Sequence, residues 1–368
     1  MEFTFTEDQD HLREAVRDFL TRAADVSYSR SMIDDPRGFT AESWVQIVEL
    51  GWPGLLVPER FGGLGLGMVD LVPVLEEMGR VPFAGPYLSS AVLATRAATL
   101  LGLDPRLVAL ADGSTRGAIG IDEEGHGNVV DRVRCRASRK TGSWRLDGVK
   151  PIVIDGHTAD WVLVAARTQQ GLGTFLVENP GERGLAVGVP SWDGTRKVAR
   201  LELHGVEAEP VGPEGDQTAI WRRIVDDGCV ALCAELIGSM EAAHHLAVEY
   251  AKVRVVFDRP IATFQVIKHK AVDMLHRIEL ARVGTHFAAW AAEVDDPRRS
   301  EAAAMAKAYV PEAANFVAAE CIQIHGGVGF TWDCDAHLHY KRAKQNDLLF
   351  GYHGIHRERV ADFYLQPA

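Results

Sequence analysis

The stretch FQVIKHKAVDMLHRIELA, residues 264–281, carries the helical periodicity on which the prediction of the fold depends. Its apolar residues recur every three or four positions, the spacing that gives an α-helix one apolar face. The same spacing runs through EAAHHLAVEYAKVRVVF, residues 241–257, and begins at about Gln217. We therefore predict a domain of long helices over residues 213–368. Pro311 lies inside this pattern, and we expect a kink or a restart there because proline lacks an amide donor.

A second helical region precedes this domain in the chain. In TFTEDQDHLREAVRDFL, residues 4–20, Thr6 is followed three residues later by Gln9, a capping-box pattern that predicts the start of a helix. Helical periodicity resumes after the glycine-rich loop at residues 57–67. We predict an amino-terminal all-α domain over residues 1–113.

The region between the two helical domains has a different character. Short β-branched runs such as WVLVAA, residues 161–166, are separated by turn signals. One of these signals, Asp147-Gly148, predicts a two-residue β-hairpin turn. Residues 114–212 are therefore predicted to form a small β-sheet domain, so the chain is a multidomain protein of helices, then sheet, then helices.

Composition excludes several classes of protein. The net charge of −12 argues against a protein that follows a nucleic-acid backbone, which needs clustered lysine and arginine. No apolar run reaches the length of about 18 residues that a membrane span needs, and the acidic start does not resemble a secretory signal. The five cysteines are scattered and odd in number, so we expect free thiols and a cytoplasmic location.

Two stretches near the carboxyl end combine histidine and glycine. In FGYHGIHRERV, residues 350–360, His353 and His356 stand three apart, but no standard ligand spacing accompanies them, so we predict no metal site. QIHGGVGF, residues 323–330, has glycines that would let backbone amides approach a phosphate, and the same glycines would serve a plain turn between helices. The residues alone leave both readings of this stretch open.

Three stretches together resemble the acyl-CoA dehydrogenase family in their order and spacing. They are QIHGGVGF, VRVVFDRPIATFQVIKHKAVDM at residues 253–274, and PERFGGLGLGMVDLVPVLEEMGR at residues 58–80. The resemblance implies that family's fold, in which the carboxyl-terminal domain is a four-helix bundle. It also implies FAD as cofactor and oxidation of an acyl-CoA thioester, with a carboxylate taking the α-proton and the flavin taking a hydride.

In such folds each FAD straddles two subunits. The resemblance assigns Arg254 to the pyrophosphate of FAD. It assigns five further residues to the ADP half of the cofactor: Phe257, Gln265, Gln323, Gly326 and Gly327.

The positions of the catalytic base do not carry the expected glutamate. FGYHG aligns with the family stretch that holds this glutamate, so His353 stands in its place. The alternative family position falls on Gly228, with Asp227 beside it. His353 is a candidate base, although protonation would turn it into a cation, and Asp227 is a candidate if the alignment shifts by one residue.

The segments aligned with the flavin-ring contacts of the family also differ from its pattern. They are GIDEEGHGN, residues 120–128, and KPIVIDG, residues 150–156. Ile152 and Ile154 have no group that could donate the hydrogen bonds expected there. The resemblance therefore implies a chain that holds the ADP half of FAD but lacks the contacts to the flavin ring.

Such a chain would be a non-catalytic subunit. KPIVIDGHTADWVLVAAR, residues 150–167, and PSWDGTRKVARLELHGV, residues 190–206, resemble non-catalytic members of actinobacterial α2β2 acyl-CoA dehydrogenases of steroid breakdown. We expect a heterotetramer with a second acyl-CoA dehydrogenase-like chain, an electron-transfer acceptor, and no nucleic-acid or membrane partner. Two alternatives stay open: a self-sufficient homotetramer that uses Asp227 or His353, and a relative that binds CoA thioesters without redox chemistry.

Overall fold

The structure is a computed structural model that describes residues 5–140 and 142–365. Its contacts divide the chain into two compact units. The helical unit comprises Met1–Arg30, Val72–Phe83 and Cys229–Ala368, and the sheet unit comprises Ser31–Leu71 and Ala84–Gly228. The predicted order of helices, strands and helices is confirmed, and the domain boundaries near residues 113 and 212 stay a prediction.

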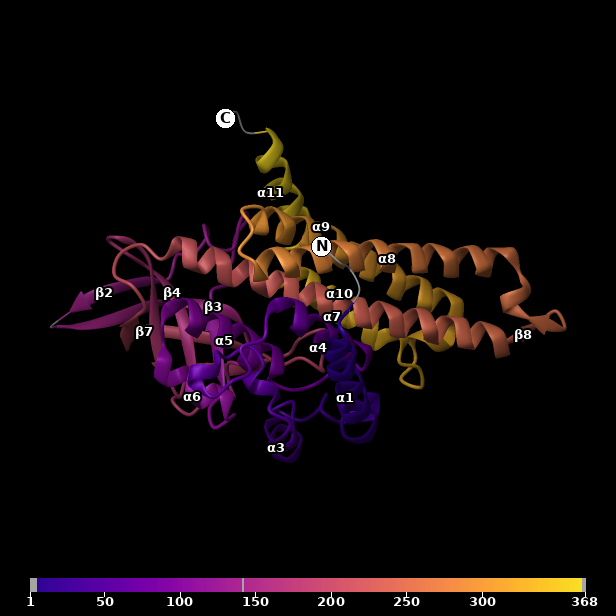
Figure 1. The fold of residues 1–368 in the computed structure, drawn as a ribbon, viewed down its shortest axis with the longest axis horizontal. Helices are drawn as coiled ribbons and strands as arrows, with labels where there is room; N and C mark the ends of the chain where they lie inside the picture. The colour runs from indigo at the N-terminus through magenta and orange to yellow at the C-terminus, as the bar shows by residue number, and fades with distance from the viewer. Residues whose placement is uncertain (1–4, 141, 366–368) are drawn as a thin grey trace. The chain divides into compact units, whose positions relative to one another are not determined.

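Helix α9 (Arg299–His325) is the central element of the carboxyl-terminal helices. It packs against α8 (Gln265–Glu293), α10 (Ala336–Leu348) and α11 (His353–Leu365), and its many alanines are buried (Figure 1). The helix continues through the buried Pro311, so of the two predicted outcomes, a kink or a restart, the restart is excluded. Packing on three helices compensates for the hydrogen bond that the proline removes.

The remaining helices of this unit are tied together by close backbone approach and by ion pairs. A Cβ added to Gly238 in α7 (Thr218–Val253) would overlap the carbonyl oxygen of Glu76 in α4 (Met68–Arg80). The buried Arg342 pairs with Glu235 and donates to the carbonyl oxygens of Pro82 and Phe83 at 3.1 and 3.2 Å. These contacts hold α4, α7 and α10 together.

The amino-terminal helix α1 (Glu7–Ala23) begins as the sequence predicts. The Thr6 hydroxyl accepts a hydrogen bond from the Gln9 amide, and the Gln9 side chain accepts one from the Thr6 amide, which confirms the capping box. Arg17 then pairs with Glu77 of α4 at 2.7 Å. The short helix α2 (Val26–Ser31) follows.

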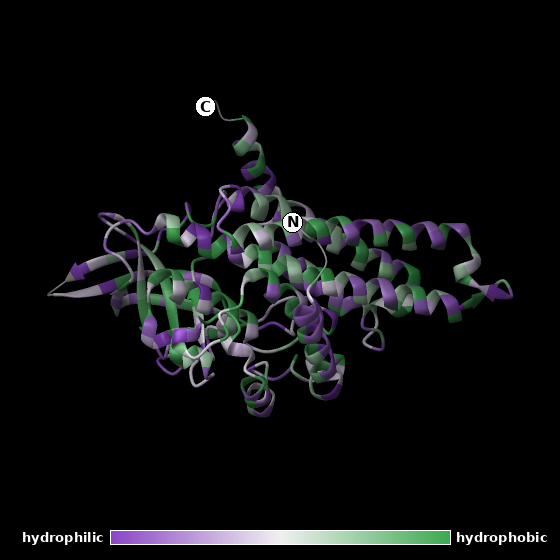
Figure 2. Ribbon diagram, viewed as in Figure 1, coloured by the Kyte–Doolittle hydropathy of each residue, from purple (hydrophilic) through white to green (hydrophobic). Residues whose placement is uncertain are grey.

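The sheet unit holds seven strands: β1 (Gly117–Gly120), β2 (Arg136–Lys140), β3 (Ser143–Ile154), β4 (Trp161–Thr168), β5 (Gly171–Glu178), β6 (Ala186–Val189) and β7 (Val198–Val211). Six of them follow the order β1-β4-β2-β3-β7-β5, which the additional pairing of β4 with β5 closes, and β6 pairs with β7 off this path. The interior is apolar, with Val162, Phe175 and Leu201 among its buried residues. In Figure 2 the outlying strand β2 is mainly hydrophilic.

The helices that lie wholly in the sheet unit precede its strands in the sequence. They are α3 (Ala41–Glu49), η1 (Trp52–Gly54), η2 (Glu59–Phe61), the π-helix η3 (Tyr87–Ala94), α5 (Thr95–Leu101) and α6 (Asp104–Ala111). The start of α7, up to Gly228, also belongs to this unit. The Ser89 hydroxyl of η3 donates to the carboxylate of Asp155, directly after β3, at 2.6 Å. None of the described helices is long and apolar enough to cross a membrane.

The predicted hairpin turn at Asp147-Gly148 is wrong, because both residues lie inside strand β3. The Asp147 carboxylate accepts a hydrogen bond from the Gly205 amide of β7, at a shift in the β3–β7 register. Gly148 packs so closely on Cys135 that a Cβ would lie 2.8 Å from its Cα. Gly148 is therefore a strand glycine that permits close packing beside a β-bulge, and it is not a turn residue.

Candidate cofactor site and catalytic residues

A pocket of about 580 Å³ lies in the helical unit, where α7 and α9 end. Arg254, Gly326 and Gly327, three of the residues predicted to contact FAD, line it. Arg254 comes directly after α7 and before the hairpin of β8 (Val255–Val256) and β9 (Arg259–Pro260). The two glycines open the 3-10 helix η5 (Gly326–Phe330), which follows α9.

The glycines leave open space beside the backbone. A Cβ at Gly326 or Gly327 would meet no atom within 4 Å, and Gly326 adopts a φ of +65°, which favours glycine. Around them the pocket is formed by Tyr250 and His325, whose rings stack at 4.3 Å. An open, side-chain-free backbone of this kind can approach a phosphate group closely.

Arg254 supplies the positive charge of this pocket. Its side chain is exposed, and among the described residues its guanidinium has no ion-pair partner. An unpaired guanidinium can bind a phosphate through two parallel hydrogen bonds. The free cation and the open glycines together fit the anionic ADP portion of FAD.

The other three predicted cofactor residues lie near this pocket in the sequence but do not line it. Phe257 is 85% exposed at the tip of the β8–β9 hairpin, where it and Asp258 have φ values of +53° and +60°. Gln265 starts α8, Gln323 lies in the last turn of α9, and both are exposed. Sequence reasoning missed several lining residues whose only signal is proximity to the glycines or to Arg254: Tyr250, Val256, Ile261, Ile324, His325, Val328 and Thr331.

His353 belongs to a hydrogen-bonded pair with Asp347. Its ring Nδ1 lies 3.0 Å from both carboxylate oxygens of Asp347, and its backbone amide donates to the same carboxylate at 3.0 Å. Because a carboxylate only accepts, Nδ1 carries the hydrogen and Nε2 of the neutral ring is left as an acceptor. Among the described residues Nε2 has no partner, so this ring can receive a proton there.

Both the carboxylate and the backbone of Asp347 accept further hydrogen bonds. Asn315 donates to its carboxylate at 3.3 Å. The buried ammonium group of Lys307 donates to the backbone carbonyls of Asn346 and Asp347 at 2.7 and 2.9 Å. The left-handed conformation of Phe350, with a φ of +59°, turns the chain so that α11 begins at His353.

Asp227, the other candidate base, is differently placed. It is buried in the sheet unit, and Arg96 donates to its carboxylate from Nε at 3.0 Å and from Nη2 at 2.9 Å. Its neighbour Gly228 lies in α7. The carboxylate of Asp227 is therefore engaged by a guanidinium.

The segments aligned with the flavin-ring contacts lie in the sheet unit. Ile154 is buried at the end of β3, and Ile152 is half-buried two residues earlier. The fully buried Lys150 pairs with Glu123 at 2.5 Å, and burial lowers the pKa of Lys150. Glu123 also accepts a hydrogen bond from the backbone amide of Cys135 at 3.0 Å. Its ion pair with Lys150 links the loop after β1 to strand β3.

Comparison with known proteins places this architecture in a family. The acyl-CoA dehydrogenase N-terminal domain matches residues 6–102, and the acyl-CoA dehydrogenase C-terminal domain matches residues 219–365. IpdE2, an acyl-CoA dehydrogenase of Mycobacterium tuberculosis, is 32% identical over 341 residues, which cover 92% of this chain and 91% of IpdE2. The chain belongs to the acyl-CoA dehydrogenase family.

Solved structures agree with this membership. A chain of the ChsE4-ChsE5 complex from Mycobacterium tuberculosis superposes with a TM-score of 0.90 at 28% identity, over 100% of both chains. The Tcur3481-Tcur3483 steroid acyl-CoA dehydrogenase, solved as a variant, superposes with a TM-score of 0.87 at 28% identity, over 97% of both chains. Acyl-CoA dehydrogenases are FAD-dependent oxidoreductases that act on a CH–CH bond.

Two further features of the described residues bear on the chemistry. All five cysteines are free and buried, which confirms the expectation of free thiols. No group of three or more His, Cys, Asp or Glu side chains is placed to hold a metal ion in residues 5–140 and 142–365.

Proposed function

We propose that the chain is one subunit of a heteromeric acyl-CoA dehydrogenase. In this assembly it binds the ADP portion of FAD, and a second acyl-CoA dehydrogenase-like chain supplies the catalytic glutamate and the contacts to the flavin ring. The observation that carries the proposal is a contrast within one polypeptide. Arg254 and the open glycines suit a dinucleotide tail, whereas the aligned position of the base holds His353 and one aligned flavin-ring segment holds Ile152 and Ile154.

Each feature of the pocket has a defined part in this proposal. Arg254 binds the pyrophosphate, and Gly326 and Gly327 let backbone groups approach it without a side chain in between. Phe257, Gln265 and Gln323 surround the same cofactor from neighbouring elements. When bound, FAD accepts the hydride that leaves the acyl-CoA.

The substrate and the setting follow from the relatives. The chain's similarity to a steroid acyl-CoA dehydrogenase supports a steroid-derived acyl-CoA thioester as substrate, and hence a part in lipid and steroid catabolism. An electron-transfer acceptor reoxidises the flavin in this scheme. The five free cysteines support a reducing, cytoplasmic compartment.

The assembly is tested by purification with and without its partner. We expect the chain expressed alone to be colourless, and co-expression with a neighbouring dehydrogenase-like gene to yield a yellow complex with two FAD per four chains. Native mass and flavin absorbance measure both numbers. A homotetramer with four FAD per four chains contradicts the proposal. If no co-expressed partner brings flavin, a CoA-thioester binder without redox chemistry is the remaining interpretation.

The role of Arg254 is tested in the purified complex. Arg254→Gln removes the unpaired cation, and a charge-assisted contact is worth about 1.5–3 kcal/mol, so the Kd for FAD should rise roughly ten- to a hundred-fold. Lys268→Gln is the matched control, because it removes an exposed cation of α8 that does not line the pocket. Equal FAD affinities in the two variants would exclude Arg254 as a phosphate ligand.

A second candidate function is favoured by the pair of His353 and Asp347. A histidine whose Nδ1 is held by a carboxylate presents Nε2 as a general base, the arrangement that serves hydrolytic triads. In this alternative the chain is a self-sufficient homotetrameric dehydrogenase, and His353 takes the α-proton. Asp227 is the weaker candidate, because Arg96 engages its carboxylate.

This alternative has its own readout. A chain purified alone should then be yellow and should bleach on addition of an acyl-CoA. His353→Gln should abolish the bleaching while FAD stays bound. Asp347→Asn should reduce the rate and change its pH profile, because the amide no longer holds the ring in one tautomer. Bleaching that survives His353→Gln would remove His353 from the mechanism.

A further inference from the structure

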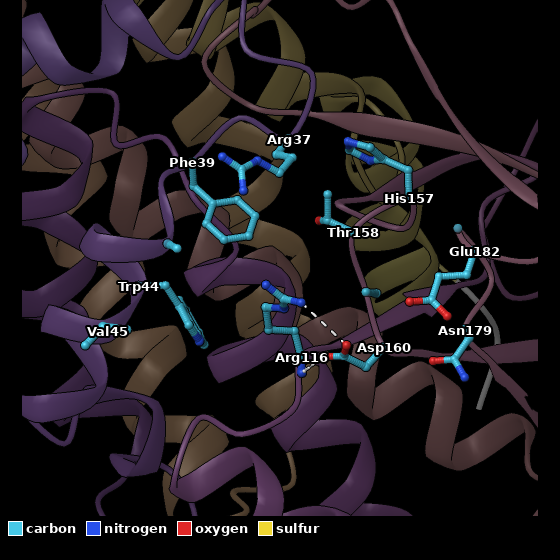
Figure 3. A pocket seen from close by; sticks show the side chains of 13 residues that line it. Arg37, Phe39, Trp44, Val45, Arg116, His157, Thr158, Asp160, Asn179 and Glu182 are labelled. Atoms are coloured by element: carbon cyan, nitrogen blue, oxygen red, sulfur yellow. Dashed lines mark hydrogen bonds and ion pairs between the residues drawn. The ribbon is translucent and has the colours of Figure 1, made fainter.

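The sheet unit contains a second cavity, of about 440 Å³, formed without any of the predicted cofactor or catalytic residues. It lies between the start of α3, the start of β1, the loop that joins β3 to β4, and the segment after β5. Figure 3 shows its side chains. The volume falls within the range of about 300–1,000 Å³ that is typical of small-molecule sites.

One wall of this cavity is apolar and aromatic. Phe39, Trp44 and Val45 line it, and Trp44 and Val45 lie on the same side in Figure 3. Both aromatic rings are held in place: Phe39 is buried beneath the guanidinium of Arg116 at 5.4 Å, and the Trp44 indole donates to the Gly113 carbonyl at 3.2 Å. A flat apolar group would pack against this wall.

The cavity is also lined by the guanidinium of Arg37, which makes few contacts within the described protein. The Nε of Arg37 lies 3.9 Å from Asp35, whose carboxylate already accepts the backbone amides of Arg37 and Gly38. The two terminal nitrogens of Arg37 have no partner among the described residues. Arg116, in contrast, is paired with Asp160. Arg37 is therefore the group that is free to bind an anion, and its planar fork suits a carboxylate.

Two further polar side chains of the cavity are His157 and Glu182. His157 Nε2 lies 2.8 Å from the Pro36 carbonyl, which can only accept, so the neutral ring carries its hydrogen on Nε2. Its Nδ1 is then an acceptor, but this atom is buried and a ligand in the cavity does not reach it. On the side opposite Trp44, Glu182 presents an exposed carboxylate that has no ion pair in the part of the chain that the structure describes. This carboxylate would accept a hydrogen bond from a ligand that donates one.

We propose that this cavity binds a small aromatic carboxylate that also carries a hydroxyl group. The carboxylate pairs with Arg37, the ring packs on Phe39 and Trp44, and the hydroxyl donates to Glu182. This assignment is independent of the proposed function, because none of these residues belongs to the cofactor pocket or to the candidate bases.

The proposal is tested by titration calorimetry on the full chain with three probes: 4-hydroxybenzoate, benzoate and benzyl alcohol. We expect 4-hydroxybenzoate to bind more tightly than benzoate, and benzyl alcohol to bind least. Arg37→Gln should weaken 4-hydroxybenzoate roughly ten- to a hundred-fold. Arg139→Gln, which removes an exposed arginine of the same unit outside the cavity, should leave its affinity unchanged.

A second variant tests the contact at the hydroxyl end of the ligand separately from the contact at its carboxylate end. Glu182→Gln should weaken 4-hydroxybenzoate and leave benzoate unaffected or bound more tightly, because only the former donates to this carboxylate. Three results would each overturn the proposal: no heat of binding at millimolar 4-hydroxybenzoate, equal affinities for all three probes, or equal losses in Arg37→Gln and Arg139→Gln.

Discussion

Gly326, Gly327 and Gly329 lie within four residues of one another at the pocket beside Arg254, and substitution by alanine should affect each of them differently. Gly329 is buried in η5, and a Cβ there would lie 2.9 Å from the carbonyl oxygen and 3.0 Å from the Cα of Ile322 in α9. These neighbours are backbone atoms, so η5 has to move away from α9. Overpacking of this kind costs about 1–3 kcal/mol, and Gly329→Ala should lower the free energy of unfolding by that amount.

Gly327→Ala should leave stability intact and affect only the ligand. Its Cβ would enter open space, and its φ is one that other residues adopt, so the free energy of unfolding should stay the same or rise by up to about 1 kcal/mol. The same methyl group enters the pocket beside Arg254, where it should weaken FAD binding by roughly tenfold or more. Gly326→Ala should lower both the stability and the FAD affinity, because the backbone of Gly326, with φ +65° and ψ −142°, is in a region that costs an alanine about 1–3 kcal/mol.

Two measurements separate these outcomes. Equilibrium urea unfolding of the full chain, followed by circular dichroism, gives the stability of each variant, and flavin absorbance of the purified complex gives its cofactor content. The reasoning is refuted if Gly327→Ala is as destabilising as Gly329→Ala. It is also refuted if Gly327→Ala keeps the full FAD content and affinity, since its side chain would then lie outside the cofactor site.

Three further predictions concern buried groups. Lys150→Met should destabilise the chain by about 3–5 kcal/mol because Glu123 is left buried without its cation, and adding Glu123→Gln should recover part of this loss in urea unfolding; strict additivity of the two losses would argue against the pair. Burial, with Lys341 and Arg30 nearby, lowers the pKa of His337 to about 4. Between pH 6.5 and about 4 the unfolded chain therefore binds a proton that the folded chain does not, and stability falls with decreasing pH by up to about 1.4 kcal/mol per unit. His337→Phe should flatten this slope relative to wild type and to the exposed-site control His11→Phe; an unchanged slope would show that His337 is not responsible. Finally, all five thiols are buried, so a thiol reagent should modify none rapidly in the folded chain and five after unfolding, and fast stoichiometric labelling of the native protein would contradict the structure.

The elements that the sequence predicted correctly have local causes. The capping box of Thr6 and Gln9 needs only residues three apart, so it can be read before any tertiary contact is known. The periodicity of residues 264–281 likewise predicts α8, because an apolar face every three or four residues is a property of the segment itself. The family resemblance rests on three such local stretches, and the comparisons confirm it.

The errors arise where a distant contact outweighs a local preference. Asp147-Gly148 has the composition of a turn, but Gly205 and Cys135, far apart in the sequence, hold it inside a strand. Pro311 stays within α9 because three other helices surround that helix. In both cases the local signal is worth about 1–3 kcal/mol, which packing and hydrogen bonding over a whole element exceed.

The sequence by itself determined the family and the order of helices and strands, because both depend on residue types at short, fixed spacings. Only the tertiary structure showed that Arg254, Gly326 and Gly327 line one pocket. It also showed that Asp347 is hydrogen-bonded to His353 and that Arg96 pairs with Asp227. Likewise, only the structure showed that Arg37 and His157 line the same cavity. Those pairings join residues that are distant in the chain, and they are set by the packing of whole elements, which no short stretch of sequence records.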